Sequence, residues 1–438
     1  MKTARLSGIY NKVVTKILFY IFFISAAGLF TATDALSQVI NVPAGDTAAL
    51  IAAINQANVA PDPATINLGG GTYTLTVINN VGQGNNGLPA IVTDMTFNGN
   101  GSIIERSSNP ATPDFRIFYI EGDDPNVTFN DLTMRNGVST STGGGGLLHA
   151  ADGIVNINDC IVADNTRISG QSAGINNDDF GTLNIYRTTV TRNIHDGSGV
   201  GVGGVINDSG GILNIMESTI SNNVGPRGGG VGNNSRGTIN MINTTVSGNM
   251  NTGDSVASAG GVYNNSSGVI NIDSSTITDN EGQVAGNIGI NSSGSVFLIN
   301  TIVGESIDGP SCFINSSGMI VSEGYNIDQG SSCGFDSASD KSNTDPRLGP
   351  LQNNGGPTET HALLPGSPAL EMGNVLCPPP ATDQRGVTRP QDERCDIGAF
   401  EGNLISNVPT LSEWGLIVMA GLLGIVGMLV MRRRKVTA

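Results

Sequence analysis

A repeat of 26 to 31 residues in the centre of the chain restricts what the chain can fold into. In five consecutive copies an asparagine stands between two apolar residues, and the steps between these asparagines are 28, 30, 26 and 31 residues. A second asparagine follows nine positions later in each copy, and a Val or Ile stands between the two. The two sets are Asn156, Asn184, Asn214, Asn240 and Asn271, and Asn165, Asn193, Asn223, Asn249 and Asn280.

Each copy offers short apolar segments separated by Gly, Asn and Ser, and none has a helical period over the length that a helix needs. A unit this small cannot bury its apolar face alone, so the units must stack. Stacked parallel strands place equivalent side chains about 4.8 Å apart, which lets the asparagines of each set form a ladder. Leucine-rich repeats would need several Leu per unit, and calcium-binding nonapeptide arrays have a much shorter period. The sequence therefore predicts an all-β fold, a right-handed parallel β-helix with Val and Ile inside.

One helix is predicted at the N-terminal end of the solenoid. Asp46 and Thr47 are suitable N-cap residues, and Pro61 ends the helix. Such a helix would cover the open strand edge of the first coil. The irregular, Pro-rich segment 340–402 is expected to close the opposite end. The apolar face of the helix consists of Ala49, Leu50, Ala53, Ile54 and Ala57.

The N-terminus has the layout of a secretory signal peptide, predicted to span residues 1–37. A basic start precedes an apolar run over residues 17–30, and Ala35 and Ser37 fit the small-residue cleavage site. An uncleaved membrane anchor remains the alternative. The basic residues are Lys2, Arg5, Lys12 and Lys16.

The C-terminus, residues 404–438, is predicted to be a sorting segment with a transmembrane helix. An apolar stretch over 416–431 is near the lower limit for a spanning helix, and the basic cluster after it should stay cytoplasmic. A plain, unprocessed membrane anchor remains the alternative. The candidate sorting residues are Val408, Pro409, Thr410, Leu411, Ser412, Glu413, Trp414 and Gly415, and the basic tail is Arg432, Arg433, Arg434 and Lys435.

The exported part is strongly acidic. Residues 38–407 contain 13 Lys+Arg and 35 Asp+Glu, which gives a net charge of −22. Such a surface repels nucleic acid and anionic lipid, so we expect no nucleic-acid partner. A divalent cation could be held by this charge, but no spacing predicts a metal site, and no motif predicts a cofactor.

All five cysteines lie in the exported part, where the compartment is oxidising and disulfides are expected. Proximity in sequence favours Cys312 with Cys333 and Cys377 with Cys395, although connectivity does not follow from sequence alone. Cys160 aligns with Thr and Ser in the other repeats, which favours a structural role.

Two blocks of sequence resemble known families. The segments GPLQNNGGP (349–357), THALLPGSP (360–368), DQRG (383–386) and CDIGAFE (395–401) resemble the end of a choice-of-anchor Q domain, and the resemblance covers residues 40–402. The C-terminal segment is similar to the IPTL-type sorting signal, with Val408 in place of the usual Ile. This second resemblance implies an exosortase-like membrane protease as partner, in a Gram-negative bacterium that makes extracellular polysaccharide.

Many β-helices cleave polysaccharides, and such sites need converging carboxylates or an arginine base. The best candidates are Asp178, Asp179, Arg187, Arg192 and His195, but their positions are those of solvated turns, and aromatic residues are scarce. We therefore assign no catalytic residue and expect a surface-displayed or secreted protein with a structural or adhesive role, extracellular polysaccharide being a candidate partner. A polysaccharide lyase or glycoside hydrolase is the alternative. The ligand, the cleavage of the tail and the oligomeric state do not follow from the sequence.

Overall fold

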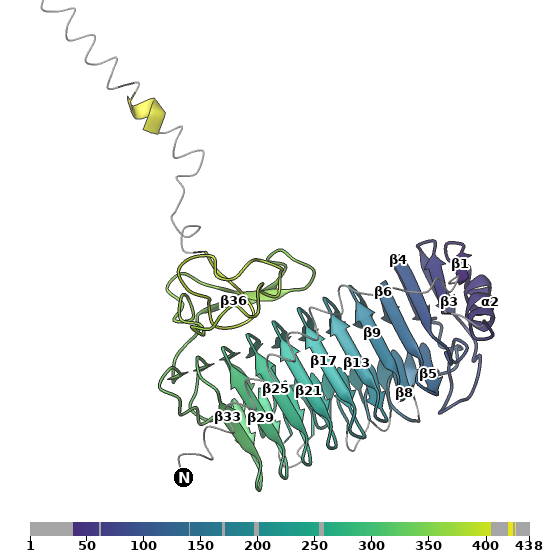
Figure 1. Ribbon diagram of the computed structural model, residues 1–438, viewed down its shortest axis with the longest axis horizontal. Coiled ribbons are helices and arrows are strands. Elements are labelled where there is room, and N and C mark those ends of the chain that lie inside the picture. The colour runs from purple at the N-terminus through teal and green to yellow at the C-terminus, as the bar shows by residue number, and fades with distance from the viewer. Residues whose placement is uncertain are drawn as a thin grey trace, which may run out of the picture. The chain divides into compact units, whose positions relative to one another are not determined.

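Parallel strands wind into a solenoid of the right-handed β-helix type between Gln38 and Ser342 (Figure 1). The computed structural model describes residues 38–60, 63–139, 141–168, 171–196, 201–253, 258–403, 419–423 and 425. The coils contribute strands to three parallel sheets of 20, 7 and 8 strands. The predicted all-β parallel β-helix is confirmed.

The 20-stranded sheet bends around one corner of the solenoid, so each full coil gives it two strands. Its strands are β1 (Gln38–Val42), β2 (Ala64–Leu68), β3 (Thr72–Leu75), β4 (Met95–Arg106), β6 (Asn126–Arg135), β9 (Ile154–Asn158), β10 (Ile161–Ala163), β13 (Thr182–Tyr186), β14 (Thr189–Thr191), β17 (Ile212–Met216), β18 (Thr219–Ser221), β21 (Thr238–Ile242), β22 (Thr245–Ser247), β25 (Val269–Asp273), β26 (Thr276–Thr278), β29 (Ser295–Ile299), β30 (Ile302–Val303), β33 (Met319–Ser322), β34 (Ile327–Asp328) and β35 (Lys341–Ser342).

The other two sheets complete each coil. The 7-stranded sheet consists of β7 (Val138–Ser139), β11 (Thr166–Arg167), β15 (Ile194–His195), β19 (Val224–Gly225), β23 (Met250–Asn251), β27 (Asn280–Glu281) and β31 (Ser306–Asp308). The 8-stranded sheet consists of β5 (Phe118–Gly122), β8 (Leu147–Ala151), β12 (Ile175–Asp178), β16 (Val205–Asn207), β20 (Val231–Asn233), β24 (Val262–Asn264), β28 (Ile288–Ile290) and β32 (Cys312–Ile314).

The strand register follows the apolar-Asn-apolar triplets of the sequence. Asn184 pairs with Asn214, and Asn214 with Asn240, so every triplet lies directly above the next. Since side chains alternate across a strand, the two apolar residues of each triplet face inward while the asparagine faces outward. The inward Leu183 and Ile185 are at most 1% exposed. The stacked triplets thus form a continuous core along the solenoid axis.

The corner between the two halves of the long sheet uses a residue in the left-handed conformation. Arg187, Glu217, Asn243 and Ser274 occupy this corner with φ between 46° and 49°. Few non-glycine residues adopt this conformation readily. A column of buried hydroxyls follows each corner residue and bonds to the backbone of the neighbouring coil, as in Thr188 N–H to Ser218 Oγ (3.1 Å).

The predicted N-terminal helix is α2 (Thr47–Ala57), next to the first strands in Figure 1. Asp46 is its N-cap and accepts a hydrogen bond from the Ala49 backbone N–H (2.9 Å). Leu50 and Ile54 are 0% exposed and join the main core cluster. The helix therefore closes the first coil with the apolar face that the sequence predicts.

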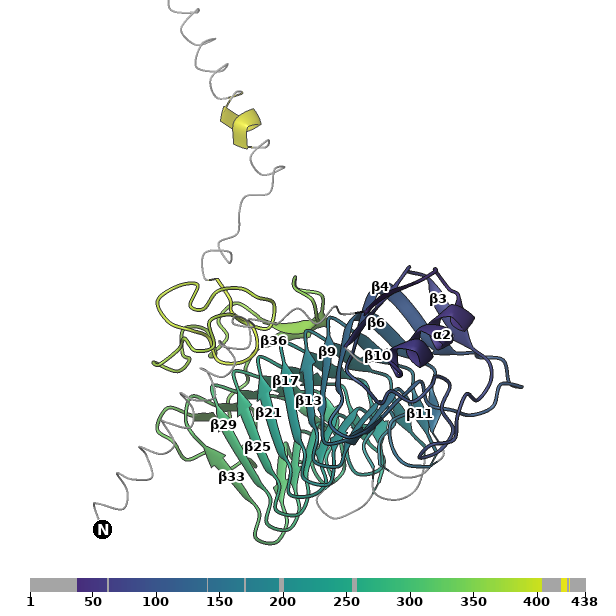
Figure 2. The same cartoon turned by 45° about the vertical axis from the view of Figure 1, so that its right-hand side comes forward.

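Residues 345–403 form a mostly irregular segment, here called the C-terminal lobe. Its only sheet pairs β36 (Leu348–Gln352) with β37 (Thr360–Leu363) in antiparallel orientation. The lobe packs against the side of the solenoid through hydrogen bonds to β18, β22 and β26. Both views show it beside the coils (Figure 2). The expectation that this region covers the open end is therefore wrong. The segment before the lobe lies at that end instead, where Cys333 is 2% exposed and Phe335 packs against the core.

Candidate functional site

An asparagine ladder lies on the outer face of the long sheet, on β9, β13, β17, β21 and β25. Each side-chain amide donates to the carboxamide oxygen of the preceding coil, over 2.7 to 2.9 Å. At its start, Asn156 donates to Thr128 Oγ1 (3.2 Å). The members of this outer ladder are the first predicted set, Asn156, Asn184, Asn214, Asn240 and Asn271.

A second outer ladder, which the sequence analysis missed, runs beside the first in the N-terminal coils. Its Nδ2–Oδ1 distances are 2.9 to 3.0 Å. The repeat was hard to recognise there because Thr65, Thr96 and Thr128 occupy the column that asparagines fill in later coils. The second ladder consists of Asn41, Asn67, Asn98, Asn130 and Asn158.

The two ladders and their flanking columns form a regular outward face, here called the ladder surface. Ile154 and Ile212 on its border are 42% and 43% exposed, and Thr182 and Thr238 alternate with them in the same column. A carboxamide has two N–H donors and two acceptor lone pairs. The hydrogen bonds of the ladder use one donor and one acceptor of each asparagine that has a neighbour on both sides. One donor and one acceptor of that asparagine therefore remain for a binding partner.

The second predicted set forms a ladder inside the solenoid. Asn165, Asn193, Asn223, Asn249 and Asn280 are each 0% exposed. In each step the oxygen of one asparagine accepts both the backbone and the side-chain N–H of its neighbour, as Asn223 Oδ1 does from Asn193 (3.0 and 2.9 Å). These asparagines satisfy backbone groups where the chain turns inside the core. Their role is structural.

A further buried ladder escaped the sequence analysis. Asn177 Nδ2 donates to Asn207 Oδ1 (2.8 Å), and Asn207 to Asn233 (3.3 Å). His149 begins this column with Nδ1 at 2.7 Å from Asn177 Oδ1, and burial lowers the pKa of His149 to about 4. The sequence feature that marks this ladder is an asparagine two positions after the Val of each Gly-Gly-Val, as at Asn264.

The candidate catalytic residues are spread around one coil, with His195 buried on β15, and they do not converge. Arg187 forms an ion pair with Asp159 (2.7 Å), and Arg192 with Asp164 (2.8 Å). Asp178, the last residue of β12, accepts from Ser209 Oγ (3.1 Å) in the turn after β16. Each arginine thus forms a surface ion pair with a carboxylate of the preceding coil, which is a structural role.

Asp179 belongs to an acidic group in the turns between the 8-stranded and 20-stranded sheets. Partial burial raises its pKa, and Asp178, Asp152 and Asp208 raise it further. Within the described ranges no group of three or more His, Cys, Asp or Glu side chains is placed to hold a metal ion.

His361 fastens the C-terminal lobe to the solenoid. Its Nδ1 lies 2.7 Å from the Gly349 carbonyl oxygen and its Nε2 lies 2.9 Å from Ser247 Oγ.

Cys160 is buried, and burial raises the pKa of its thiol to about 12. A neutral thiol is a poor nucleophile, so Cys160 fills a place in the hydroxyl column of the corner.

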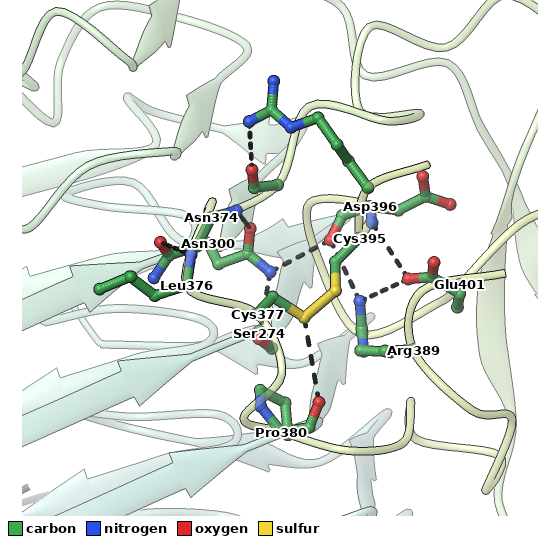
Figure 3. Close-up of a disulfide and its surroundings, with 12 residues drawn as sticks. Ser274, Asn300, Asn374, Leu376, Cys377, Pro380, Arg389, Cys395, Asp396 and Glu401 are labelled. Carbon is green, nitrogen blue, oxygen red and sulfur yellow. Dashed lines mark hydrogen bonds and ion pairs between the residues drawn. A yellow bond between two sulfur atoms is a disulfide. The ribbon is translucent and has the colours of Figure 1, made fainter. Parts of the chain in front are cut away.

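The two predicted disulfides are confirmed. Cys312–Cys333 ties the last coils together, and Cys377–Cys395 lies within the C-terminal lobe. Figure 3 shows the second disulfide beside a buried charged group: Arg389 donates to Glu401 (2.9 Å), and the Asp396 backbone N–H donates to the same carboxylate (3.0 Å).

The predicted signal peptide 1–37, the sorting residues 408–415 and the basic tail 432–435 lie outside the described residues. Of the apolar stretch 416–431, only 419–423 and 425 are described. In the part of the chain that the structure covers, no helix is long and apolar enough to cross a membrane. The transmembrane helix and the signal peptide therefore stay predictions.

Comparisons with known proteins gave one structural match and one motif match. The solved structure described as "Crystal structure of pectate lyase Pel9A" is similar to this chain, with 13% identity, coverage of 85% of this chain and 98% of that one, and a TM-score of 0.44. No curated protein matches the sequence. Residues 408–434 match the IPTL-CTERM motif. The choice-of-anchor Q resemblance stays a prediction, and the matched sorting motif identifies the chain as an exported surface protein.

Proposed function

We propose that this protein is a non-catalytic, surface-displayed adhesive scaffold that binds extracellular polysaccharide through its ladder surface. The observation that carries the proposal is the outer asparagine ladder, which presents unused amide groups along the solenoid, except at Asn214, which is 8% exposed. The IPTL-CTERM match supports display outside the cell after processing by an exosortase-like protease.

The chemistry of the ladder surface suits a polymer of hydroxyl-bearing units. Each asparagine that has a ladder neighbour on both sides keeps one free N–H and one free oxygen lone pair. A sugar hydroxyl can accept from that N–H and donate to that oxygen. The groups recur along the solenoid, so several weak contacts can act together on one chain. The exported part has a net charge of −22, which disfavours acidic polysaccharides. Neutral polysaccharides are therefore the proposed class.

A triple variant, Asn184→Thr, Asn214→Thr and Asn240→Thr, tests the ladder surface. Threonine fits this column, since Thr128 occupies it one coil before Asn156. Losing the two more accessible amides, those of Asn184 and Asn240, should weaken retention on neutral polysaccharide by roughly thirtyfold, at about 1 kcal/mol for each amide. Retention is measured by co-sedimentation of residues 38–403 with a polysaccharide panel that includes the host's own.

A matched control uses another partly exposed ladder, at the corner after β24 and β28. There Asn265 and Asn291 each donate to the asparagine of the preceding coil, over 3.1 and 3.0 Å. Asn265→Thr with Asn291→Thr should leave retention unchanged. Equal loss in both variants would contradict the assignment to the ladder surface. Shortened polysaccharide chains after incubation would contradict the non-catalytic role and favour a lyase or hydrolase.

A further inference from the structure

Two arginines are buried together beside the 7-stranded and 8-stranded sheets. Arg116 precedes β5 and is 0% exposed, and Arg167 on β11 is 1% exposed. Arg116 Nη2 lies 3.3 Å from Ser139 Oγ, and Arg167 Nη1 lies 3.1 Å from the same oxygen. The two guanidinium nitrogens therefore lie no farther apart than the sum of these two distances.

The protein partners of the pair are neutral. Arg116 Nη2 also donates to the carbonyl oxygens of Gln83 (3.0 Å) and Thr142 (2.6 Å), and Arg167 Nη2 donates to that of Ser141. No carboxylate that the structure describes forms an ion pair with either arginine. By contrast, the equally buried Arg389, which is 2% exposed, is paired with Glu401 (2.9 Å).

Several donors of the pair have no partner among the described residues. These are Nε and Nη1 of Arg116 and Nε of Arg167. Burial lowers the pKa of both arginines to about 10, and for Arg116 the charge of Arg167 adds to this effect. Both side chains are therefore cationic at neutral pH. Two buried like charges with unused donors need a compensating negative charge.

We propose that Arg116 and Arg167 form a binding site for a small oxyanion. Planar guanidinium groups match the oxygens of sulfate, phosphate and carboxylate. Gln83 and Ser141, whose carbonyl oxygens accept from the two arginines, are exposed. An anion can therefore reach the arginines from solvent beside these residues. The ligand is either a free inorganic oxyanion or the carboxylate of an acidic sugar. The site lies apart from the ladder surface, so it is independent of the proposed adhesive function.

Calorimetric titration of the mature protein in anion-poor buffer at pH 7 tests the site with two probes, sodium sulfate and sodium glucuronate. Binding of sulfate with or without glucuronate indicates an inorganic oxyanion site, and binding of glucuronate alone indicates an acidic sugar site. The absence of heat with both probes overturns the proposal. Concentrations are kept well below those at which sulfate stabilises proteins generally.

Arg167→Gln should weaken binding on the order of tenfold or more, since it removes a charged donor. Arg192→Gln is the matched control, because Arg192 is bonded to Asp164 at the surface, and it should bind as the parent does. Equal affinity in the parent and in Arg167→Gln overturns the proposal. Should Arg167→Gln fail to fold, selenate in crystals of the parent gives the decision: its anomalous peak lies beside Arg116 and Arg167 or the assignment is wrong.

Discussion

At the scale of single residues, the buried and the exposed asparagines differ in what their removal costs. Asn223 is 0% exposed and its side chain makes four hydrogen bonds, two of them as acceptor from Asn193. Asn223→Ala leaves buried groups unpaired, and each such group costs about 1–3 kcal/mol. We expect the free energy of unfolding to fall by roughly 3 kcal/mol, measured by urea denaturation.

Asn271→Ala is the comparison, because Asn271 is exposed and donates to Asn240 (2.8 Å) at the end of the outer ladder. Water can replace that bond, so the loss should be about 0.5 kcal/mol. Similar losses of unfolding free energy in both variants would show that burial does not increase the contribution of the asparagines inside the solenoid.

The asparagine columns could be predicted because a solenoid repeats the same position at each coil, so Asn156 and Asn184 align in sequence as in space. The pairing of Arg116 with Arg167 could not, since Arg116 precedes β5 while Arg167 lies on β11, and the two meet at the hydroxyl of Ser139. Thr65 and Thr96 hid the second outer ladder by replacing the asparagine that marks the repeat. Periodic positions are thus visible in the sequence, although the column of Asn177, Asn207 and Asn233 was not recognised as a ladder, and single contacts between coils are not visible.

At the scale of elements, the attachment of the C-terminal lobe depends on contacts with no sequence period, such as Thr219 Oγ1 to the Glu359 carbonyl oxygen (2.6 Å). The sequence predicted the Cys377–Cys395 link within the lobe, but not the face on which the lobe packs. Gln384 also joins Thr219 and Thr245 across this interface (2.9 and 2.6 Å).

Asp396 should make the stability of the lobe depend on pH. Burial, and then the Glu401 carboxylate, raise its pKa to about 7, from an ordinary value of 3.8. The folded state therefore binds more protons than the unfolded state between these values, so stability rises as pH falls through 7. From pH 8 to 6.5 we expect a gain of roughly 0.8 kcal/mol in the free energy of unfolding, from urea denaturation.

The range stops at pH 6.5 because burial lowers the pKa of His361, so its protonation in the unfolded state opposes the trend at lower pH. Asp396→Asn removes the titrating group and should flatten the profile between pH 8 and 6.5. A parent protein whose stability is constant or falls over this range would contradict the assignment to Asp396.

At the scale of the whole molecule, a solenoid remains soluble only if its first coil is covered. The strands β2 and β3 border α2, and Leu50 and Ile54 seal the core there. Leu50→Asp with Ile54→Asp should detach the helix and expose strand edges that pair with other copies. We expect soluble aggregates or fibres, detected by light scattering and size-exclusion chromatography, while the strand content seen by circular dichroism is largely kept. Ala52→Asp, on the exposed side of the same helix, should remain as the parent. A monodisperse double variant would mean that the coil edge is protected by its own backbone twist and that α2 is dispensable as a cover.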